Sequence, residues 1–455
     1  MGGLNTSLLI GLQALQATQG ALNATSNNIA NSGTAGYTRE VVQFSENAER
    51  LSGGIVLGGG VSLDSLQSVR DELLNLQIQQ QTSQQSSADT QLASLQQLQT
   101  YFSSTGQDIA SALTAFSKSL SQLSANPSSG GAQQGVVSSG QNLAYAFNST
   151  ANGLQTAQSD ADSQVTQTVA QINTVTQQIA QLNAQISQLG GAEKDGGTVQ
   201  DQRDELVKHL SELTGVSISQ GSDGETITTA NGSPLVVGSQ SFSLQTAKGS
   251  DGVQHVLDTS GNDITSSVQG GQLGGAIQLR DQILPGFLSQ LNALASQFAN
   301  AFNAAQALGY DSSGNKGGDF FSVPAVGQDA AAGISVKITD PSLIAISSDG
   351  SVGSNGNVAN LSAALTTPLA SGGSVSDGYA SLVYQVGTAA SNASTQSSAI
   401  GQHLLQLTNQ QSSVSGVNID EETTNLIRFQ TAYEAAARIV STIQQLDSVT
   451  INMIS

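Results

Sequence analysis

The stretch that decides the fold is SNNIANSGTAGYTR, residues 26–39, which closes the first long helical pattern of the chain. The apolar residues that precede or enter it recur every seven positions on one stripe, namely Leu8, Leu15, Leu22 and Ile29. Asn31 and Gly33 both tolerate the left-handed backbone conformation that ends a helix. The sequence therefore predicts one amphipathic helix over residues 1–31.

The residues after this helix have the composition of a tight bend. Gly36 permits a positive φ angle, and Tyr37 offers an aromatic ring that can anchor the chain as it leaves the helix. The residues expected to define the helix exit are Asn31, Thr34, Gly36, Tyr37 and Arg39.

The far end of the chain carries a second amphipathic helix. Gly416–Glu422 opens it, with Asn418 or Asp420 as the cap and acidic residues suited to a helix start. Its apolar positions follow a 3-4 spacing, and the residues expected at its interface are Phe429, Ala432, Tyr433, Ala436, Ile439, Ile443, Leu446 and Met453. Each terminal helix lacks a local partner, so the two are predicted to pair with each other as a coiled coil.

The middle of the chain is predicted to be mainly helical with one β insertion. Helical patterns cover residues 62–125, 141–189, 198–214, 276–308 and 377–413. Short alternating runs between Gly, Asp and Asn turns predict a small β domain over 216–275. The expected organisation is a terminal coiled-coil domain (1–40 plus 416–455), an elongated helical rod (41–215 plus 276–415) with a loop-rich edge at 309–375, and the β-rich outer domain at 216–275.

The composition excludes several classes of protein. Thirteen basic and 33 acidic residues give a net charge of −20, which disfavours nucleic-acid binding. No apolar run is long enough to span a membrane, and the first residues lack a secretory signal. Charged residues make up only 10% of the 455 residues, and this uncharged polarity suits surfaces that pack against copies of themselves.

The sequence contains no recognisable catalytic or cofactor motif. It has no cysteine, three scattered histidines, and neither a phosphate-binding loop nor a nucleophile elbow. The stretch 311–319 resembles the start of a calcium loop, but Lys316 stands where the invariant glycine belongs and Ser322 where the bidentate glutamate belongs. We therefore expect no cofactor, no metal and no enzymatic activity.

An Arg-Asp pair recurs at Arg70-Asp71, Arg203-Asp204 and Arg280-Asp281, each followed within two residues by an apolar residue. Such a pair can latch one rod helix to the next. A chance recurrence in leucine-rich helices explains it almost as well, because the spacing is not that of a solenoid repeat.

Residues 26–39 resemble the N-terminal signature of the flagellar rod, hook and hook-associated proteins, in which a helix ends in Ala-Asn before a Thr-x-Gly-Tyr/Phe turn. The C-terminal stretch 416–438, GVNIDEETTNLIRFQTAYEAAAR, resembles the closing helix of the hook-associated protein 1 family. The long Gln-rich helices at 62–125 and 141–189 also fit that family better than the rod or hook proteins.

The resemblance implies a non-enzymatic part of the bacterial flagellum that assembles at the distal end of the hook and joins it to the filament. It implies several partners: copies of the chain itself, the hook protein, a second junction protein, and an export chaperone on the C-terminal helix. It implies an extracellular location reached by type III export without a cleaved signal. The alternatives are a hook or distal-rod protein, or an adhesin or enzyme carried on the β insertion.

Overall fold

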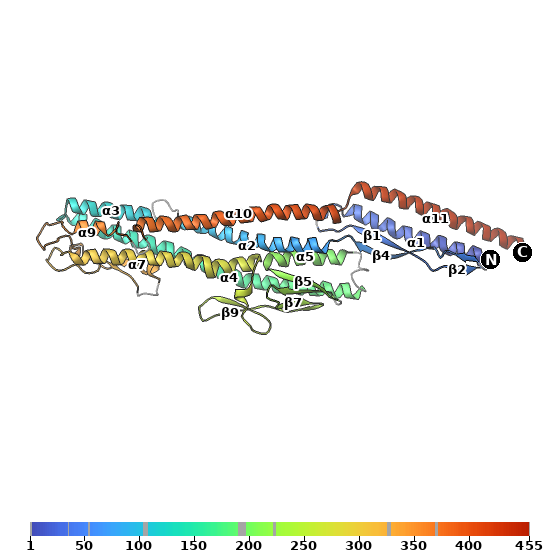
Figure 1. The fold of residues 1–455 in the computed structure, drawn as a ribbon, viewed down its shortest axis with the longest axis horizontal. Coiled ribbons are helices and arrows are strands. Elements are labelled where there is room, and N and C mark those ends of the chain that lie inside the picture. Colours follow the sequence, from blue (N-terminus) through green and yellow to red (C-terminus); the bar gives the residue numbers. More distant parts are fainter. Residues whose placement is uncertain are drawn as a thin grey trace.

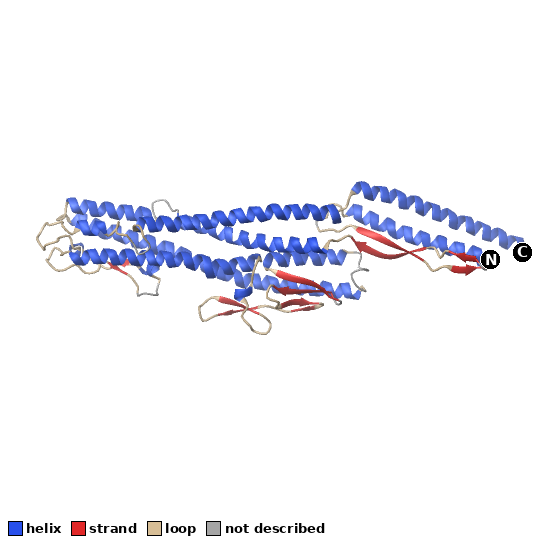
Figure 2. Ribbon diagram, in the orientation of Figure 1, coloured by secondary structure: helices blue, strands red, loops and turns tan. Residues whose placement is uncertain are grey.

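The computed structural model describes residues 2–34, 36–52, 55–102, 108–189, 197–221, 224–324, 329–368 and 372–454. The molecule is long and narrow, with a helical rod at one end and a pair of terminal helices at the other (Figure 1). Helices dominate, and the strands are confined to small sheets along the side (Figure 2). The predicted mainly helical fold with a β insertion is confirmed.

The helices of the described residues are α1 Gly2–Ala30, α2 Glu72–Phe102, α3 Ile109–Ala125, α4 Gly130–Gln188, α5 Thr198–Leu213, α6 Gly271–Gln278, α7 Leu284–Leu308, α8 Ala330–Gly333, α9 Val358–Ala363, α10 Val375–Ser415 and α11 Ile419–Ile454. Short helical turns are η2 Thr265–Ser267, the π-helix η3 Leu279–Ile283, and η4 Pro341–Leu343.

The strands are β1 Glu40–Glu46, β2 Arg50–Ser52, β3 Ile55–Leu57, β4 Val61–Ser68, β5 Val216–Gly221, β6 Gly224–Thr229, β7 Pro234–Val237, β8 Gln240–Ser241, β9 Gln245–Lys248, β10 Gln254–Leu257, β11 Phe321–Ser322 and β12 Ser335–Val336.

The two terminal helices lie side by side, as predicted. Helix α1 runs from the N-terminus toward the rod and α11 runs back, so both chain ends meet at one tip (Figure 1). Strands β1 and β4 form an antiparallel ribbon that packs along α1. This region, called the terminal domain below, thus contains α1, α11 and the β1–β4 ribbon.

The expected helix over residues 62–125 is wrong at its beginning. Residues 61–68 form β4, whose backbone pairs with β1 from Glu40↔Ser68 to Glu46↔Val61. Helix α2 begins only after Asp71, whose Oδ1 accepts the Leu74 N–H at 3.0 Å and caps the first turn. The leucines of this stretch are compatible with either structure, and pairing with β1, which lies 15–28 residues earlier in the chain, decides between them.

The rod has its largest core at the end away from the terminal domain. Helices α3, α4, α7 and α10 surround a cluster of phenylalanine rings with centroid separations of 4.8–6.4 Å, formed by Phe116, Phe147, Phe298, Phe302, Phe320 and Phe321. Edge-on and tilted pairs prevail among them, as aromatic quadrupoles favour. Helix α4 runs along the rod and links this core to the β insertion.

The β insertion packs against the second half of α4. Strands β5–β8 form one antiparallel sheet in sequential order, and β9 and β10 form a separate hairpin. Val165, Ile172 and Ile179, part of the predicted α4 stripe, are buried against this region, whereas Leu189 at the stripe's end is exposed. Within the loop-rich edge at 309–375, the short strand β12 pairs with β11.

Candidate functional site

Three segments of the chain meet at the joint between the terminal domain and the rod. Residues 31–39 form the turn from α1 to β1 within the terminal domain, while residues 69–71 and 416–418 connect the terminal domain to α2 and α10 of the rod. The backbone of Arg39 connects all three, because its N–H donates to Ser415 O and its carbonyl accepts the Val69 N–H, both at 2.9 Å. Its side chain reaches α11 through an ion pair with Glu421 at 3.2 Å.

Asn28, on the last turn of α1, holds the returning chain against the helix. Its Nδ2 donates to Glu40 O and its Oδ1 accepts the Glu40 N–H, both at 2.9 Å, so the amide imitates a neighbouring strand. The same Oδ1 accepts the Tyr37 hydroxyl at 2.8 Å. Asn28 is almost fully buried, and both Nδ2 and Oδ1 of its side chain form the hydrogen bonds that a buried amide requires.

The predicted helix-exit residues form one compact turn. Asn31 donates through Nδ2 to Asn27 Oδ1 at 2.8 Å, and the Thr34 hydroxyl donates to Asn31 Oδ1 at 3.3 Å. Gly36 has a φ of 78°, the left-handed region that favours glycine. A Cβ at this position would meet only Glu205 Oε2 at 3.6 Å, so backbone conformation and not space requires glycine here.

One rod carboxylate contacts two of these three segments. Asp201, in the first turn of α5, accepts the Thr38 hydroxyl at 2.6 Å and the Thr38 N–H at 3.0 Å. It also pairs with Arg70 at 2.6 Å, and Arg70 continues to Asp204 and to the Gly197 carbonyl. The α5 end of the rod is thereby tied to both strands of the ribbon.

Burial and charge set the protonation of this network. Burial raises the pKa of the Tyr37 phenol, and nearby Glu40 and Asp201 raise it further, so the hydroxyl keeps its proton and donates to Asn28. Burial also raises the pKa of Asp201, while the Thr38 hydrogen bonds and the Arg70 guanidinium oppose that rise.

Each recurring Arg-Asp phrase contributes an arginine that reaches another element. Arg70 binds α5 as described, Arg203 pairs with Glu225 of β6 at 2.8 Å, and Arg280 pairs with Asp162 of α4 at 2.6 Å. The second and third side chains are almost fully buried. Arg70 therefore joins the segment before α2 to α5, Arg203 joins α5 to the insertion, and Arg280 joins η3 to α4.

The predicted stripe of α11 divides between two faces. Ala436 and Ile443 are buried toward α1, together with Val440, which was not among the predicted residues. The half-buried Phe429 instead packs against Phe44 of β1, with the ring centroids 6.4 Å apart. The remaining predicted residues are exposed, namely Ala432, Tyr433, Ile439, Leu446 and Met453. One partner helix covers only half of this apolar surface, and whether the other half contacts neighbouring subunits stays a prediction.

Helix α1 contacts its neighbours mainly through small residues. Ala17, Ala21 and Ala24 are buried, and a Cβ added to Gly11 would stand 2.8 Å from Val440 Cγ2. The predicted leucine stripe is only half-buried beside this face, at Leu8, Leu15, Leu22 and Ile29. Small side chains let the helix backbones approach closely, a feature that a search for large apolar residues overlooks.

Two grooves flank the helix-exit turn. The larger, of about 700 Å³, lies between that turn and helices α4 and α5, with Tyr37, Leu182 and Leu206 in its walls. The smaller, of about 470 Å³, lies between the turn, the start of α2 and the end of α10. Both are open and mixed in polarity.

The described residues contain no cluster of histidine, aspartate or glutamate arranged to hold a metal. Among them, no helix is long and apolar enough to cross a membrane. The calcium-like stretch closes on itself, because Asp311 Oδ1 accepts the N–H groups of Ser313 and Asn315 at 2.8 and 2.9 Å. That is an ordinary Asp turn, in which the side-chain oxygen binds backbone N–H groups two and four residues later.

The acidic residues of the β insertion have separate structural partners. Glu225 pairs with Arg203, Asp251 contacts His255, and Asp258 caps the turn that contains Asn262. Asp223 lies outside the described residues. This arrangement offers no support for an active site on the insertion.

The chain is similar over nearly its whole length to known flagellar proteins. A flagellar hook-associated protein 1 from Bacillus subtilis is 31% identical to the chain over 503 aligned residues, which cover 98% of each protein. The chain belongs to the flagellar hook-associated protein 1 family. Members of this family from Escherichia coli and Salmonella typhimurium are each 29% identical, over 100% and 97% of the chain.

Family models match both the rod and the termini. Residues 95–321 match the flagellar hook-associated protein FlgK helical domain. Residues 8–38 match the flagella basal body rod protein family, and residues 409–453 match the flagellar basal body rod FlgEFG protein C-terminal family. The fold also resembles that of the flagellar hook junction protein FlgK from Burkholderia pseudomallei, with a TM-score of 0.68 at 21% identity over 75% of the chain and all of that protein.

The residues that hydrogen-bond the helix-exit turn to its surroundings were not predicted from the sequence. Asn28 lies within residues 26–39 and in the predicted helix, but its hydrogen bonds to Glu40 and Tyr37 were not predicted, and Thr38 was not singled out. Asp201 is 163 positions away from its Thr38 partner. The only sequence signal for this contact was the Arg-Asp phrase at Arg70.

Proposed function

We propose that this protein assembles at the distal end of the flagellar hook and forms the junction between hook and filament. It is a structural component of the flagellum and has no enzymatic role. The observation that best supports this is the pairing of the two chain ends in a member of the hook-associated protein 1 family, with an apolar stripe of α11 left exposed.

The exposed stripe of α11 contacts neighbouring copies in the assembled junction. Ile439 and Leu446 are 54% and 51% exposed, and Met453 is 82% exposed. Covering such side chains stabilises an assembly by roughly 25 cal/mol per Å² of apolar surface removed from water. The apolar side chains of α11 that α1 leaves exposed are available for contact with helices of neighbouring copies.

The low charge of several long helices, in the terminal domain and in the rod, allows close lateral packing. Helices α1 and α7 contain no charged residue, and α4 contains only Asp160 and Asp162 in 59 residues. Packing such surfaces together avoids the desolvation cost of isolated charges. Copies of the chain, the hook protein and a second junction protein are the expected neighbours.

The route to this position is type III flagellar export without a cleaved signal, with a cytoplasmic chaperone on α11 before export. The exposed side chains of that helix, among them Ile427 and Ile439, provide an apolar face for such a chaperone. The mature location is extracellular, at the hook–filament junction.

The first test is to add gold-labelled purified protein to isolated hooks and locate the label by electron microscopy. We expect label at the distal hook tip only, and filament subunits growing from labelled tips. Long tubes of the protein alone would instead support a hook or distal-rod protein. Absence of label from hooks would contradict the junction role.

Replacing Gly36 with valine should impair addition to hook tips. A β-branched residue at a φ of 78° is a severe outlier, and a left-handed conformation costs L-residues roughly 1–2 kcal/mol or more. The exit turn would then leave α1 at another angle. The fraction of gold-labelled tips measures the effect.

Gly33→Ala is the matched control for this substitution. Gly33 lies in the same turn, is not among the glycines with positive φ, and has no atom within 4 Å of an added Cβ. Equal labelling by the Gly36→Val variant and the wild type would show that the exit conformation does not matter for assembly.

A further inference from the structure

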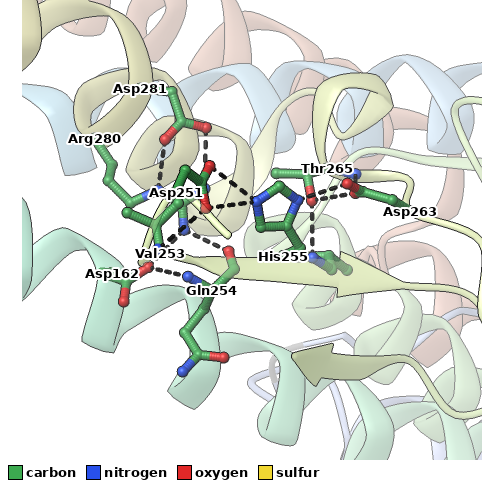
Figure 3. Close-up of polar contacts among 10 residues, drawn as sticks. Asp162, Asp251, Val253, Gln254, His255, Asp263, Thr265, Arg280 and Asp281 are labelled. Atoms are coloured by element: carbon green, nitrogen blue, oxygen red, sulfur yellow. Dashed lines mark hydrogen bonds and ion pairs between the residues drawn. The ribbon is translucent and has the colours of Figure 1, made fainter. Parts of the chain in front are cut away.

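The β9–β10 hairpin holds a histidine between two carboxylates (Figure 3). His255, on β10, places Nδ1 2.5 Å from Asp263 Oδ2 and Nε2 3.1 Å from both carboxylate oxygens of Asp251. Asp251 belongs to the turn between β9 and β10, and Asp263 to the loop that follows β10. The ring thus bridges two loops on opposite sides of its strand.

The protonation state follows from counting donors. An ionised carboxylate only accepts hydrogen bonds, and a neutral imidazole carries one N–H and one lone pair. Both contacts can be hydrogen bonds only if both ring nitrogens carry a proton. A neutral ring would turn a lone pair toward one of the two carboxylates.

We propose that His255 is a proton-dependent clasp, which fastens the β9–β10 turn to the loop after β10 when the ring is doubly protonated and releases one of the two when the proton is lost. This device concerns the outer insertion and is independent of the proposed junction role.

The inner side of β10 has a separate attachment that does not depend on the clasp. The Gln254 N–H donates to Asp162 Oδ1 of α4 at 2.8 Å, and the Gln254 carbonyl accepts from Arg280 of η3 at 2.6 Å (Figure 3). Loss of the proton therefore loosens the outer rim of the hairpin while β10 stays on the rod.

Asp263 connects the clasp to the core of the insertion. Its Oδ1 accepts the Thr265 N–H at 2.9 Å and hydroxyl at 2.6 Å, and Thr265 Oγ1 accepts the N–H of the buried Val256 at 2.8 Å. The loop side of the clasp is thus the firmer side, and the Asp251 turn is expected to be released. The other charged groups on the surrounding elements are Lys248, Asp258, Asp162, Arg280 and Asp281.

The direction of the pH effect follows from these contacts. The hydrogen bond to Asp263, then that to Asp251, raises the pKa of His255, while the pKa of Asp263 is lowered to about 2, first by Thr265. A raised histidine pKa contributes stability that is fully present below the unfolded-state value of about 6.5 and is lost as pH rises through the folded-state value. The side chains are partly exposed, so solvent screening keeps the effect modest.

The test is an NMR titration of the histidine ring signals in the full-length protein. The chain has only three histidines, so His255→Gln assigns the signal, and the exposed His403 provides an internal reference. We expect a His255 midpoint above about 6.5, lowered by about 0.2–0.7 pH units in each of Asp251→Asn and Asp263→Asn. Asp258→Asn, in the same loop without a His255 contact, should leave it unchanged. A midpoint at or below 6.5, or no response to either substitution, would overturn the proposal.

Hydrogen exchange tests the loosening itself. Wild type and His255→Gln are compared at one pH well below the measured midpoint and at one well above it. Residues 249–253 should exchange faster in the variant at the low pH and equally in both proteins at the high pH. A difference that is the same at both pH values would mean that the ring acts by packing alone and would refute the clasp.

Discussion

A chain that lacks residues 424–455 should fail to add to hook tips while its rod stays folded. The truncation removes most of α11 and exposes the small-residue face of α1 around Ala17, Ala21 and Ala24. The large hydrophobic clusters of the rod and insertion contain no residue of the terminal helices, so their thermal unfolding should change little. Labelled tips and circular dichroism melting curves measure the two effects. Normal labelling by the truncated chain would contradict the proposed role of the helix pair.

Two adjacent residues of α11 separate its two faces. Val440 is buried against α1, whereas Ile439 is 54% exposed. Val440→Asp places a charge inside the chain's own helix pair, and Ile439→Asp places the same charge on the outward stripe. Val440→Asp should prevent assembly because it disrupts the helix pair. Ile439→Asp should also prevent assembly if neighbouring subunits cover the outward stripe. Assembly by Ile439→Asp at the wild-type level would assign the interface to another face.

Arg280→Ala should cost roughly 3 kcal/mol of unfolding free energy, because breaking a buried charge pair leaves its partners uncompensated. The guanidinium is fully buried and pairs with Asp162 and Asp281 at 2.6 Å, while it also donates to the Gln254 carbonyl. The carboxylates are 22% and 36% exposed, which places the cost at the low end of the range for buried pairs. Denaturant unfolding measures it.

Lys337→Ala is the control for the arginine substitution. Its ion pair with Asp319 has a similar length of 2.9 Å, but both side chains are more than half exposed. Such a pair contributes roughly 0–1 kcal/mol, so the variant should unfold nearly like the wild type. If the two substitutions lower the unfolding free energy equally, burial does not explain the contribution of the Arg280 contacts to stability.

The fold was largely predictable wherever periodicity ran for many turns. Helix α5 was expected at 198–214 and spans Thr198–Leu213, and α10 was expected at 377–413 and spans Val375–Ser415. Prediction failed at residues 62–68, where a short leucine-containing stretch is compatible with helix and strand alike. Pairing with residues 40–46 satisfies its backbone, and that contact is not a local property of the sequence.

The long helices, the helix exit at Gly36 and the pairing of the chain ends could be predicted from the sequence, because heptad spacing and glycine's access to positive φ are local properties. Only the tertiary structure decided which half of the α11 stripe faces α1, since close packing at Gly11 rotates the contact toward Val440. It also decided that Asp201 receives Thr38 and Arg70 at the joint. Those partners are separated by more than 130 positions, and the packing of α5 against both α4 and α2 brings them within hydrogen-bonding distance.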